Sequence, residues 1–406
     1  MLQKRRQKRA KNRGCWDVGT CGKGWHWRNV LSSCCWNCWE RGRVHLAGLR
    51  LRDRDAIITR EGLIFRVFGY THPPEAYICD AEYAPSNLFK SSNPKAYRTD
   101  GEKVFYKFYE DEGWRFVEEK FPQYMIPYEP INRKVVGVRH SDVESVRKPE
   151  EALKRLIEKE PKDELLKALQ KVLEATALSS GLSLEDFGVF GSLLQGFYHP
   201  KFSDIDIIVY GRKNLERIRE ILQELYKDKG SGFSNEFEDH SSIKGKVWRF
   251  KSISPDEFVW HQKRKTIYGV FRDETSRRAI KFEFEPVKGW SEITNEYDQI
   301  RRITREGWVK AYLRIKDDSD APFMPSIYHV EVVRIVEGPR VEDLRRIVSY
   351  LEEFRMQAWR GETVYAEGNL ERVETQKGEG FHQITLTYGP RYYEQVLKVA
   401  EPKVKN

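Results

Sequence analysis

Phe187-Gly-Val-Phe-Gly-Ser192, eleven further residues, and Asp204-Ile-Asp-Ile-Ile-Val-Tyr210 form the clearest structural pattern in this 406-residue sequence. Apolar residues before and after the spacer predict two buried strands, and the Gly-Ser pair predicts a turn from the first strand into a helix. Glycine in such a turn lets backbone N–H groups approach a phosphate closely, because no Cβ stands in the way. The segment therefore predicts a strand–turn–helix–strand unit with a phosphate site at its turn.

Asp204 and Asp206 lie two residues apart in the second of these strands, so their side chains are expected on the same face. Ile205 and Ile207 then point into the core. Two neighbouring carboxylates repel each other unless a cation lies between them, and Mg²⁺ prefers such oxygen ligands, with nucleotide phosphates completing its shell. We expect Asp204 and Asp206 to be catalytic residues and metal ligands.

A third carboxylate is expected from the neighbouring strand predicted at Ala279–Pro286, which contains Phe282-Glu-Phe-Glu285. Both glutamates would lie on one face of that strand. Glu283 is the first choice as third catalytic residue and metal ligand, because apolar residues flank it on both sides. Glu285 stays open as the alternative, and Asp273 is a more remote one.

These residues resemble the signature of the DNA polymerase β-like nucleotidyltransferase superfamily, in which a hydrophobic residue and Gly-Ser are followed, after a spacer, by Asp-hydrophobic-Asp. The likeness covers Phe187–Glu285. It implies a mixed sheet with flanking helices, an NTP bound through Gly191 and Ser192, and two Mg²⁺ ions held by Asp204 and Asp206. A glutamate as third acid departs from the more usual aspartate.

The chain is also similar to a group of archaeal proteins described as predicted nucleotidyltransferases, whose substrate is unknown. The shared stretches are Ala321-Pro-Phe-Met-Pro-Ser326 and Gly389-Pro-Arg-Tyr-Tyr-Glu-Gln395. The likeness to this group extends the resemblance from the motif to the body of the chain.

The resemblance implies an enzyme that transfers NMP from an NTP to a hydroxyl acceptor and releases pyrophosphate, with RNA, including tRNA, as the favoured acceptor. Transfer to a protein side chain and a non-catalytic nucleotide- or RNA-binding module of the same fold remain alternatives. Lys201 and Lys213 bracket the aspartate strand and are candidates for contact with the triphosphate, although lone surface lysines are usually only solvated. The alternative interpretation of the motif is a Gly-Ser turn followed by a solvated acidic strand end.

The length of the chain predicts two or three domains. We expect a β-rich domain over residues 44–140, the nucleotidyltransferase domain over 150–305 and a small α+β domain over 306–406, so that the fold class is mixed α+β. Arg139–Pro149 is polar and is expected to be a linker. Two further expectations are a strand at Trp114–Val117 and a helix at Val341–Trp359.

Residues 1–43 differ from the rest of the chain. They hold eleven Lys or Arg against two acids, an excess equal to the net charge of +9, so residues 44–406 are balanced and provide no general basic field for nucleic acid. Five of the six cysteines and five of the eleven tryptophans also lie here. We expect a disordered extension or a misassigned start, with a zinc knuckle around Cys35 and Cys38 or a basic arm as alternatives.

The remaining composition predicts a soluble protein of the cytoplasm. No long uncharged apolar run is present, so no contact with a membrane is expected. The body of the chain is rich in Lys and Glu and poor in Cys, which is typical of a thermophile and of a reducing compartment. The oligomeric state is not indicated by the sequence.

Overall fold

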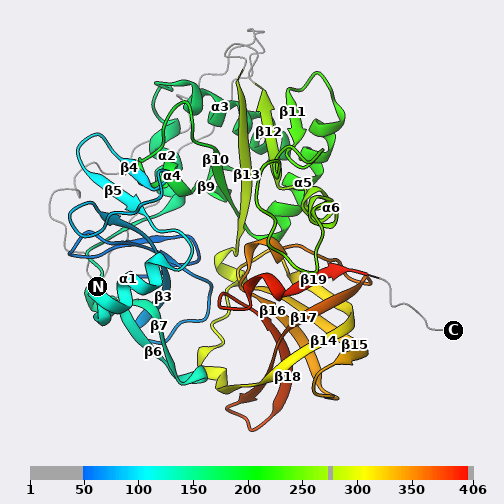
Figure 1. The fold of residues 1–406 in the computed structure, drawn as a ribbon. Coiled ribbons are helices and arrows are strands. Elements are labelled where there is room, and N and C mark those ends of the chain that lie inside the picture. Colours follow the sequence, from blue (N-terminus) through cyan, green and yellow to red (C-terminus); the bar gives the residue numbers. More distant parts are fainter. Residues whose placement is uncertain (1–48, 273–277, 401–406) are drawn as a thin grey trace, which may run out of the picture. The chain divides into compact units, whose positions relative to one another are not determined.

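The computed structural model describes residues 49–272 and 278–400, which belong to one compact unit, Val44–Asn406 (Figure 1). The expectations for residues 1–43 and for Asp273 lie outside this part of the chain. Three hydrophobic cores organise it: one at 51–146, one mainly at 152–287 and one mainly at 309–399. No helix among the described residues is long and apolar enough to cross a membrane.

The first core lies under a sheet of eight strands, as expected for a β-rich segment. Its strand order is β4-β5-β3-β2-β1-β8, and β7 pairs with both β3 and β6. The strands are β1 (Ala56–Ile58), β2 (Ile64–Val67), β3 (Ala76–Pro85), β4 (Tyr97–Thr99), β5 (Val104–Lys107), β6 (Met125–Tyr128), β7 (Arg133–Arg139) and β8 (Ser145–Arg147). Because β8 pairs with β1, the expected linker instead completes the edge of this sheet.

The strand expected at Trp114–Val117 is wrong, because these residues belong to helix α1 (Glu112–Lys120). In a strand, Trp114 and Phe116 would share a face, yet Trp114 is exposed and Phe116 is buried. The buried positions Gly113, Phe116 and Val117 follow helical spacing instead. An acidic first turn and a basic last turn support the helix.

The central sheet is mixed and has helices packed against it, as the resemblance implied. Its order is β11-β12-β13-β10-β9, and only the pair β10–β13 is parallel. The strands are β9 (Phe187–Val189), β10 (Ile205–Tyr210), β11 (Phe233–Asn235), β12 (Tyr268–Arg272) and β13 (Ala279–Val287). The helices are α2 (Pro149–Ile157), α3 (Glu164–Leu173), α4 (Gly191–Gln195), α5 (Arg212–Lys227) and α6 (Pro255–Lys265).

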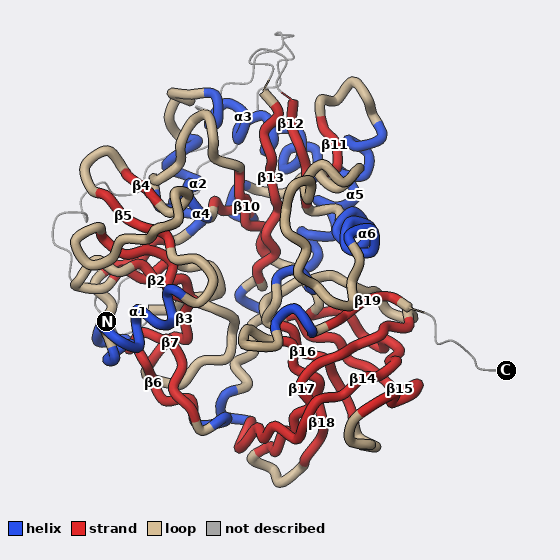
Figure 2. Tube along the Cα trace, viewed as in Figure 1, coloured by secondary structure: helices blue, strands red, loops and turns tan. Residues whose placement is uncertain are grey.

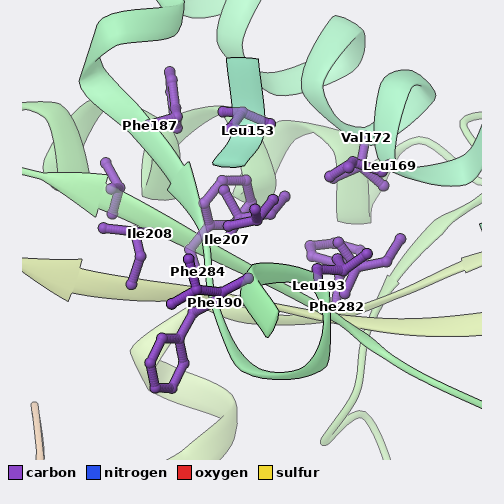
Figure 3. Packing of buried hydrophobic residues seen from close by; sticks show 14 of the residues in the cluster. Leu153, Leu169, Val172, Phe187, Phe190, Leu193, Ile207, Ile208, Phe282 and Phe284 are labelled. Atoms are coloured by element: carbon purple, nitrogen blue, oxygen red, sulfur yellow. The ribbon is translucent and has the colours of Figure 1, made fainter. Parts of the chain in front are cut away.

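Helices α2 and α3 cover one face of this sheet. Figure 3 shows Leu153 of α2 and Leu169 of α3 on the side of the strands where Phe187 lies, whereas the ring of Phe190 points away from these helices. Every residue of β10 except Asp206 is buried, and three of these buried residues are isoleucines. An apolar layer therefore fixes one face of the aspartate strand, and the other face carries Asp206 beside the buried Ile208 and Tyr210.

The third core is enclosed by a sheet that closes on itself, because β14 pairs with both β15 and β17 (Figure 2). Its order is β14-β15-β16-β18-β17-β19, with β16 and β18 parallel. The strands are β14 (Ile300–Asp320), β15 (Ser326–Glu337), β16 (Leu344–Ser349), β17 (Thr363–Thr375), β18 (Gly380–Leu386) and β19 (Val396–Val399). Its first strand begins at Ile300, and the domain boundary expected at residue 306 stays a prediction.

The helix expected at Val341–Trp359 is wrong. The segment forms β16 and a short 3-10 turn at Glu352–Phe354. Strand β16 lies between β15 and β18 and buries Ile347, Val348 and Ser349 in succession, and such a continuous buried run cannot be told from a buried helix by periodicity. Within residues 306–400, all of which the structure describes, there is no α-helix, so this part is β rather than α+β.

Candidate active site

The Gly-Ser turn and the aspartate strand are in direct contact. Helix α4 begins at Gly191, whose φ is +58°, a conformation that favours glycine. A Cβ on Gly191 would lie 2.3 Å from Oδ2 of Asp206, and the Phe190 N–H donates to the Asp206 carbonyl oxygen at 2.9 Å. The carboxylate of Asp206 is therefore seated against the backbone of the turn, where only glycine leaves room for it.

The register between β10 and β13 decides which glutamate accompanies the aspartates. Asp206 is paired with Glu283, whereas Glu285 is paired with Ile208. Directly paired residues point to the same face of a sheet, so Asp206 and Glu283 are lateral neighbours and Glu285 lies one step further along. Of the two glutamates, Glu283 is therefore the one that lies directly beside Asp206.

Asp204 and Asp206 present the least engaged carboxylates of the site. Asp204 is exposed just before β10, and Asp206 is half-buried. In the described part of the chain, neither carboxylate makes a hydrogen bond or ion pair. Burial, and then the charges of Asp204 and Glu285, raise the pKa of Asp206 to about 8, while Lys107 and Arg54 oppose that rise. A divalent cation bound between the two carboxylates would offset this repulsion between their negative charges.

Glu283 and Glu285 are instead bound by buried arginines. Arg355 donates from Nη2 to Oε1 of Glu283 at 2.6 Å and from Nη1 to Oε2 of Glu285 at 2.8 Å. Arg54 donates from Nη2 to the same Glu285 oxygen at 2.7 Å. Burial raises the pKa of Glu285, but Arg54 and Arg355 outweigh it and hold that pKa below its usual value. Burial and Glu285 raise the pKa of Glu283 well above its usual value, with Arg355 opposing them.

These contacts extend into a network that joins the three segments of the chain. Glu352, after β16, accepts from Nη2 of Arg54 at 3.0 Å and from Nη1 of Arg66 in β2 at 3.1 Å. We call the set the arginine–glutamate network: Arg54, Arg66, Glu283, Glu285, Glu352 and Arg355. Arg54 and Met356, the residue after Arg355, have φ values of +74° and +52°, which are strained for residues other than glycine. The surrounding packing must therefore hold the backbone in place at these two positions.

The residues around the turn fit a metal that is shared with a nucleotide. Within residues 49–272 and 278–400, no three His, Cys, Asp or Glu side chains are arranged as a ready metal site. Asp204 and Asp206 nevertheless offer free carboxylate oxygens, and Mg²⁺ is commonly held by one or two carboxylates together with substrate phosphates and water. Glu283 would complete such a set through Oε2, because its Oε1 is bound to Arg355.

The expected phosphate-binding residues divide into two groups. Ser192 lies at the turn and donates a long hydrogen bond of 3.4 Å to the Ser203 hydroxyl. Lys201 is exposed on the loop between α4 and β10, where its backbone N–H donates to Nδ1 of His199 at 3.1 Å. Lys213 is exposed in α5, beyond the far end of β10, and Asp204 lies about 20 Å away along the strand. The structure brings Gly191, Ser192 and Lys201 to the aspartates, but not Lys213.

Sequence reasoning missed Arg54, Arg355 and Lys107. Arg54 belongs to the alternating run Arg52-Asp53-Arg54-Asp55 beside an apolar strand, and this charge pattern was the available signal, because charged residues next to a buried strand need partners. Arg355 was hidden by the incorrect helix. Lys107 lies among aromatic residues in β5, and nothing in the sequence connects that strand with Asp206.

Comparison with known proteins agrees with the geometry. Residues 169–268 match the family model described as a nucleotidyltransferase domain. An uncharacterized protein of Methanocaldococcus jannaschii is 28% identical over 354 residues, which cover 86% of this chain and 99% of that protein. No solved structure matches. The predicted resemblance to nucleotidyltransferases and to an archaeal protein of unknown substrate is thereby confirmed, and the family match contains the Gly-Ser turn and both aspartates.

Proposed function

We propose that this chain, which contains a nucleotidyltransferase domain, transfers NMP from an NTP to a hydroxyl group of an acceptor. The observation that carries the proposal is the seat of Asp206 against the Gly191 turn, where a Cβ would come within 2.3 Å of its carboxylate. This contact puts a free pair of acids beside the backbone that would receive a phosphate. The backbone of the turn would then bind the phosphates of the same nucleotide whose metal ion the two aspartates hold.

In the proposed reaction, the acceptor hydroxyl gives its proton to water and its oxygen forms a bond to the α-phosphorus. The bond between that phosphorus and the oxygen that bridges to the β-phosphate breaks, and pyrophosphate leaves. Magnesium, when bound, would lower the pKa of the acceptor hydroxyl and neutralise the leaving group. The carboxylate oxygens of Asp204 and Asp206 would hold that ion, and Glu283, which is paired with Asp206, would be the third acid. Gly191 and Ser192 would orient the phosphates through backbone N–H groups and the Ser192 hydroxyl, so that positioning supplies much of the catalysis.

For the acceptor we propose RNA. Phe202 supports a partner that carries nucleobases, because its side chain is 82% exposed two residues before Asp204. The loop that presents it is ordered by hydrogen bonds: the Phe202 N–H donates to the His199 carbonyl at 3.1 Å, and the His199 N–H donates to the Ser203 hydroxyl at 2.9 Å. An exposed aromatic ring on such a loop is a platform on which a base can stack.

The proposal is tested by incubation of the protein with Mg²⁺ and each α-labelled NTP, alone, with total tRNA and with cell extract. Label in RNA that withstands protease is the expected result. Label in protein would identify a side chain as acceptor, and nucleotide binding without transfer would indicate a non-catalytic module. The variant in which both Asp204 and Asp206 are changed to Asn must lose all transfer. Activity that survives this change would refute the assignment of the acids.

A further inference from the structure

One face of the N-terminal sheet packs against the Gly-Ser helix. Tyr83 of β3 is paired with Lys107 of β5, so both side chains point to the same face, and Phe105 shares it because it lies two residues from Lys107. The rings of Tyr83 and Phe105 contact Phe197, with centroids 5.4 Å and 4.8 Å apart. Phe197 follows α4 directly, and its N–H donates to the Ser192 carbonyl at 2.9 Å. Lys107 therefore lies on the face of the N-terminal sheet that packs, through Phe197, against the Gly-Ser helix.

Lys107 makes no ion pair or hydrogen bond with a carboxylate within the part of the chain that the structure describes. It is half-buried, and its Nζ lies 6.0 Å from the centroid of the Tyr109 ring. Arg66 in β2 of the same sheet is different, because it pairs with Asp80 at 2.9 Å and with Glu352 at 3.1 Å. Burial raises the pKa of Glu82 and of Asp206, and the charge of Lys107 opposes this rise. No carboxylate among the described residues binds the Lys107 ammonium group directly, so this group is available to an anion from outside the chain.

Of the other cations near the acids, Lys201 is exposed to solvent on the loop before Asp204, and Arg278 donates to the carbonyl oxygens of Pro200 and Ser203. Arg54 and Arg355 are bound to Glu283, Glu285 and Glu352. Lys213 lies at the opposite end of β10. A triphosphate brought next to Asp204 and Asp206 would need a positive charge from the protein, and the compact ammonium of a lysine is a common phosphate ligand.

We propose that Lys107 of the N-terminal sheet binds the β- and γ-phosphates of the nucleotide, so that the nucleotide site is built from two segments of the chain and not from the nucleotidyltransferase fold alone. This inference rests on the proposed function. It gives the N-terminal sheet a direct part in substrate binding in addition to its role in the arginine–glutamate network.

The test uses the full chain with Mg²⁺, the NTP that the wild type binds most tightly, in non-hydrolysable form, and the matching NMP. Titration calorimetry should show that Lys107→Met lowers the affinity for the triphosphate by about 10- to 100-fold and leaves the affinity for NMP unchanged. Lys107→Arg should retain most of the wild-type affinity for the triphosphate. Lys103→Met is the matched control, because Lys103 is exposed just before the same strand and should bind as the wild type does.

A second measurement on the wild type avoids any effect of substitution on folding. Acetylation of lysines, followed by mass spectrometry, should be slowed at Lys107 by the Mg²⁺–NTP complex but not by NMP, with Lys103 unaffected by either. Equal triphosphate affinity of wild type and Lys107→Met, or equal loss of NTP and NMP affinity, would overturn the role of Lys107 and leave the proposed function intact. A wild type that binds no NTP would overturn both.

Discussion

Gly191→Ala is the substitution that most directly probes the contact between the turn and the acid. The new Cβ would lie 2.3 Å from Oδ2 of Asp206, whereas a carbon–oxygen contact needs about 3.3 Å. The carboxylate must therefore retreat by about 1 Å, and a misplacement of that size costs roughly 100-fold in rate. The left-handed backbone adds about 1–2 kcal/mol of strain to the folded state, which would be seen as a loss of stability by a few degrees.

Gly196→Ala separates the two effects. Gly196 closes the same helix at φ +72°, but a Cβ there meets nothing within 4 Å, so this variant has the strain without the collision. We expect similar denaturation midpoints for the two variants, with transfer rate and Mg²⁺–NTP affinity reduced only in Gly191→Ala. If both variants kept wild-type transfer, or lost it equally, the close contact between Asp206 and Gly191 would not be needed for catalysis.

Three further predictions concern the charges of the site. Burial and Asp204 raise the pKa of Asp206 to about 8 from 3.8, so the folded state holds the proton more tightly than the unfolded state, and this group's contribution to stability falls as pH rises from about 4 to about 8. The melting temperature of Asp206→Asn relative to that of the wild type should therefore rise over this pH range. Parallel melting-temperature curves for the two proteins would contradict the shift. For the same reason a proton competes with the metal, so Mn²⁺ affinity measured by electron paramagnetic resonance should increase with pH up to about 8 and then level off; a flat profile would count against Asp206 as a ligand. Arg355→Met leaves Glu283 and Glu285 with one partner fewer and should lower the free energy of unfolding by about 3–5 kcal/mol, with a smaller loss when Glu285→Gln is added; equal losses in urea titrations would mean that the two residues are not coupled.

The part of the site that is local in sequence could be predicted. Gly191, Ser192, Asp204 and Asp206 lie within one strand–turn–helix–strand unit, so the side-chain alternation of a strand and the needs of a turn were sufficient. The register of β13 against β10 places Glu283 beside Asp206, and the role of Glu283 as third acid stays a prediction. Register between distant strands depends on tertiary packing and is not encoded in a short motif.

The part of the site that depends on contacts between distant segments could not be predicted. Arg54 and Glu285 are 231 residues apart in the chain, and Arg355 meets them only because the segment after β16 turns back to the central sheet. Because a helix was expected over Val341–Trp359, the contact of Arg355 with the central sheet could not be predicted. A buried run such as Ile347-Val348 is compatible with a helix and with a strand. Lys107 was interpreted as part of an aromatic strand, because the side-chain contacts that connect β5 with α4 pass through Phe197.

The central claim is that Asp204 and Asp206 share a divalent ion with a nucleotide seated at Gly191 and Ser192. A crystal structure of the protein with Mn²⁺ and a non-hydrolysable NTP, with the ion located by its anomalous signal, tests it most directly. The account predicts an anomalous peak within coordination distance of carboxylate oxygens from both aspartates and of the triphosphate, with phosphate oxygens at the Gly191 turn. Nucleotide bound elsewhere, or a peak that touches neither aspartate, would contradict it.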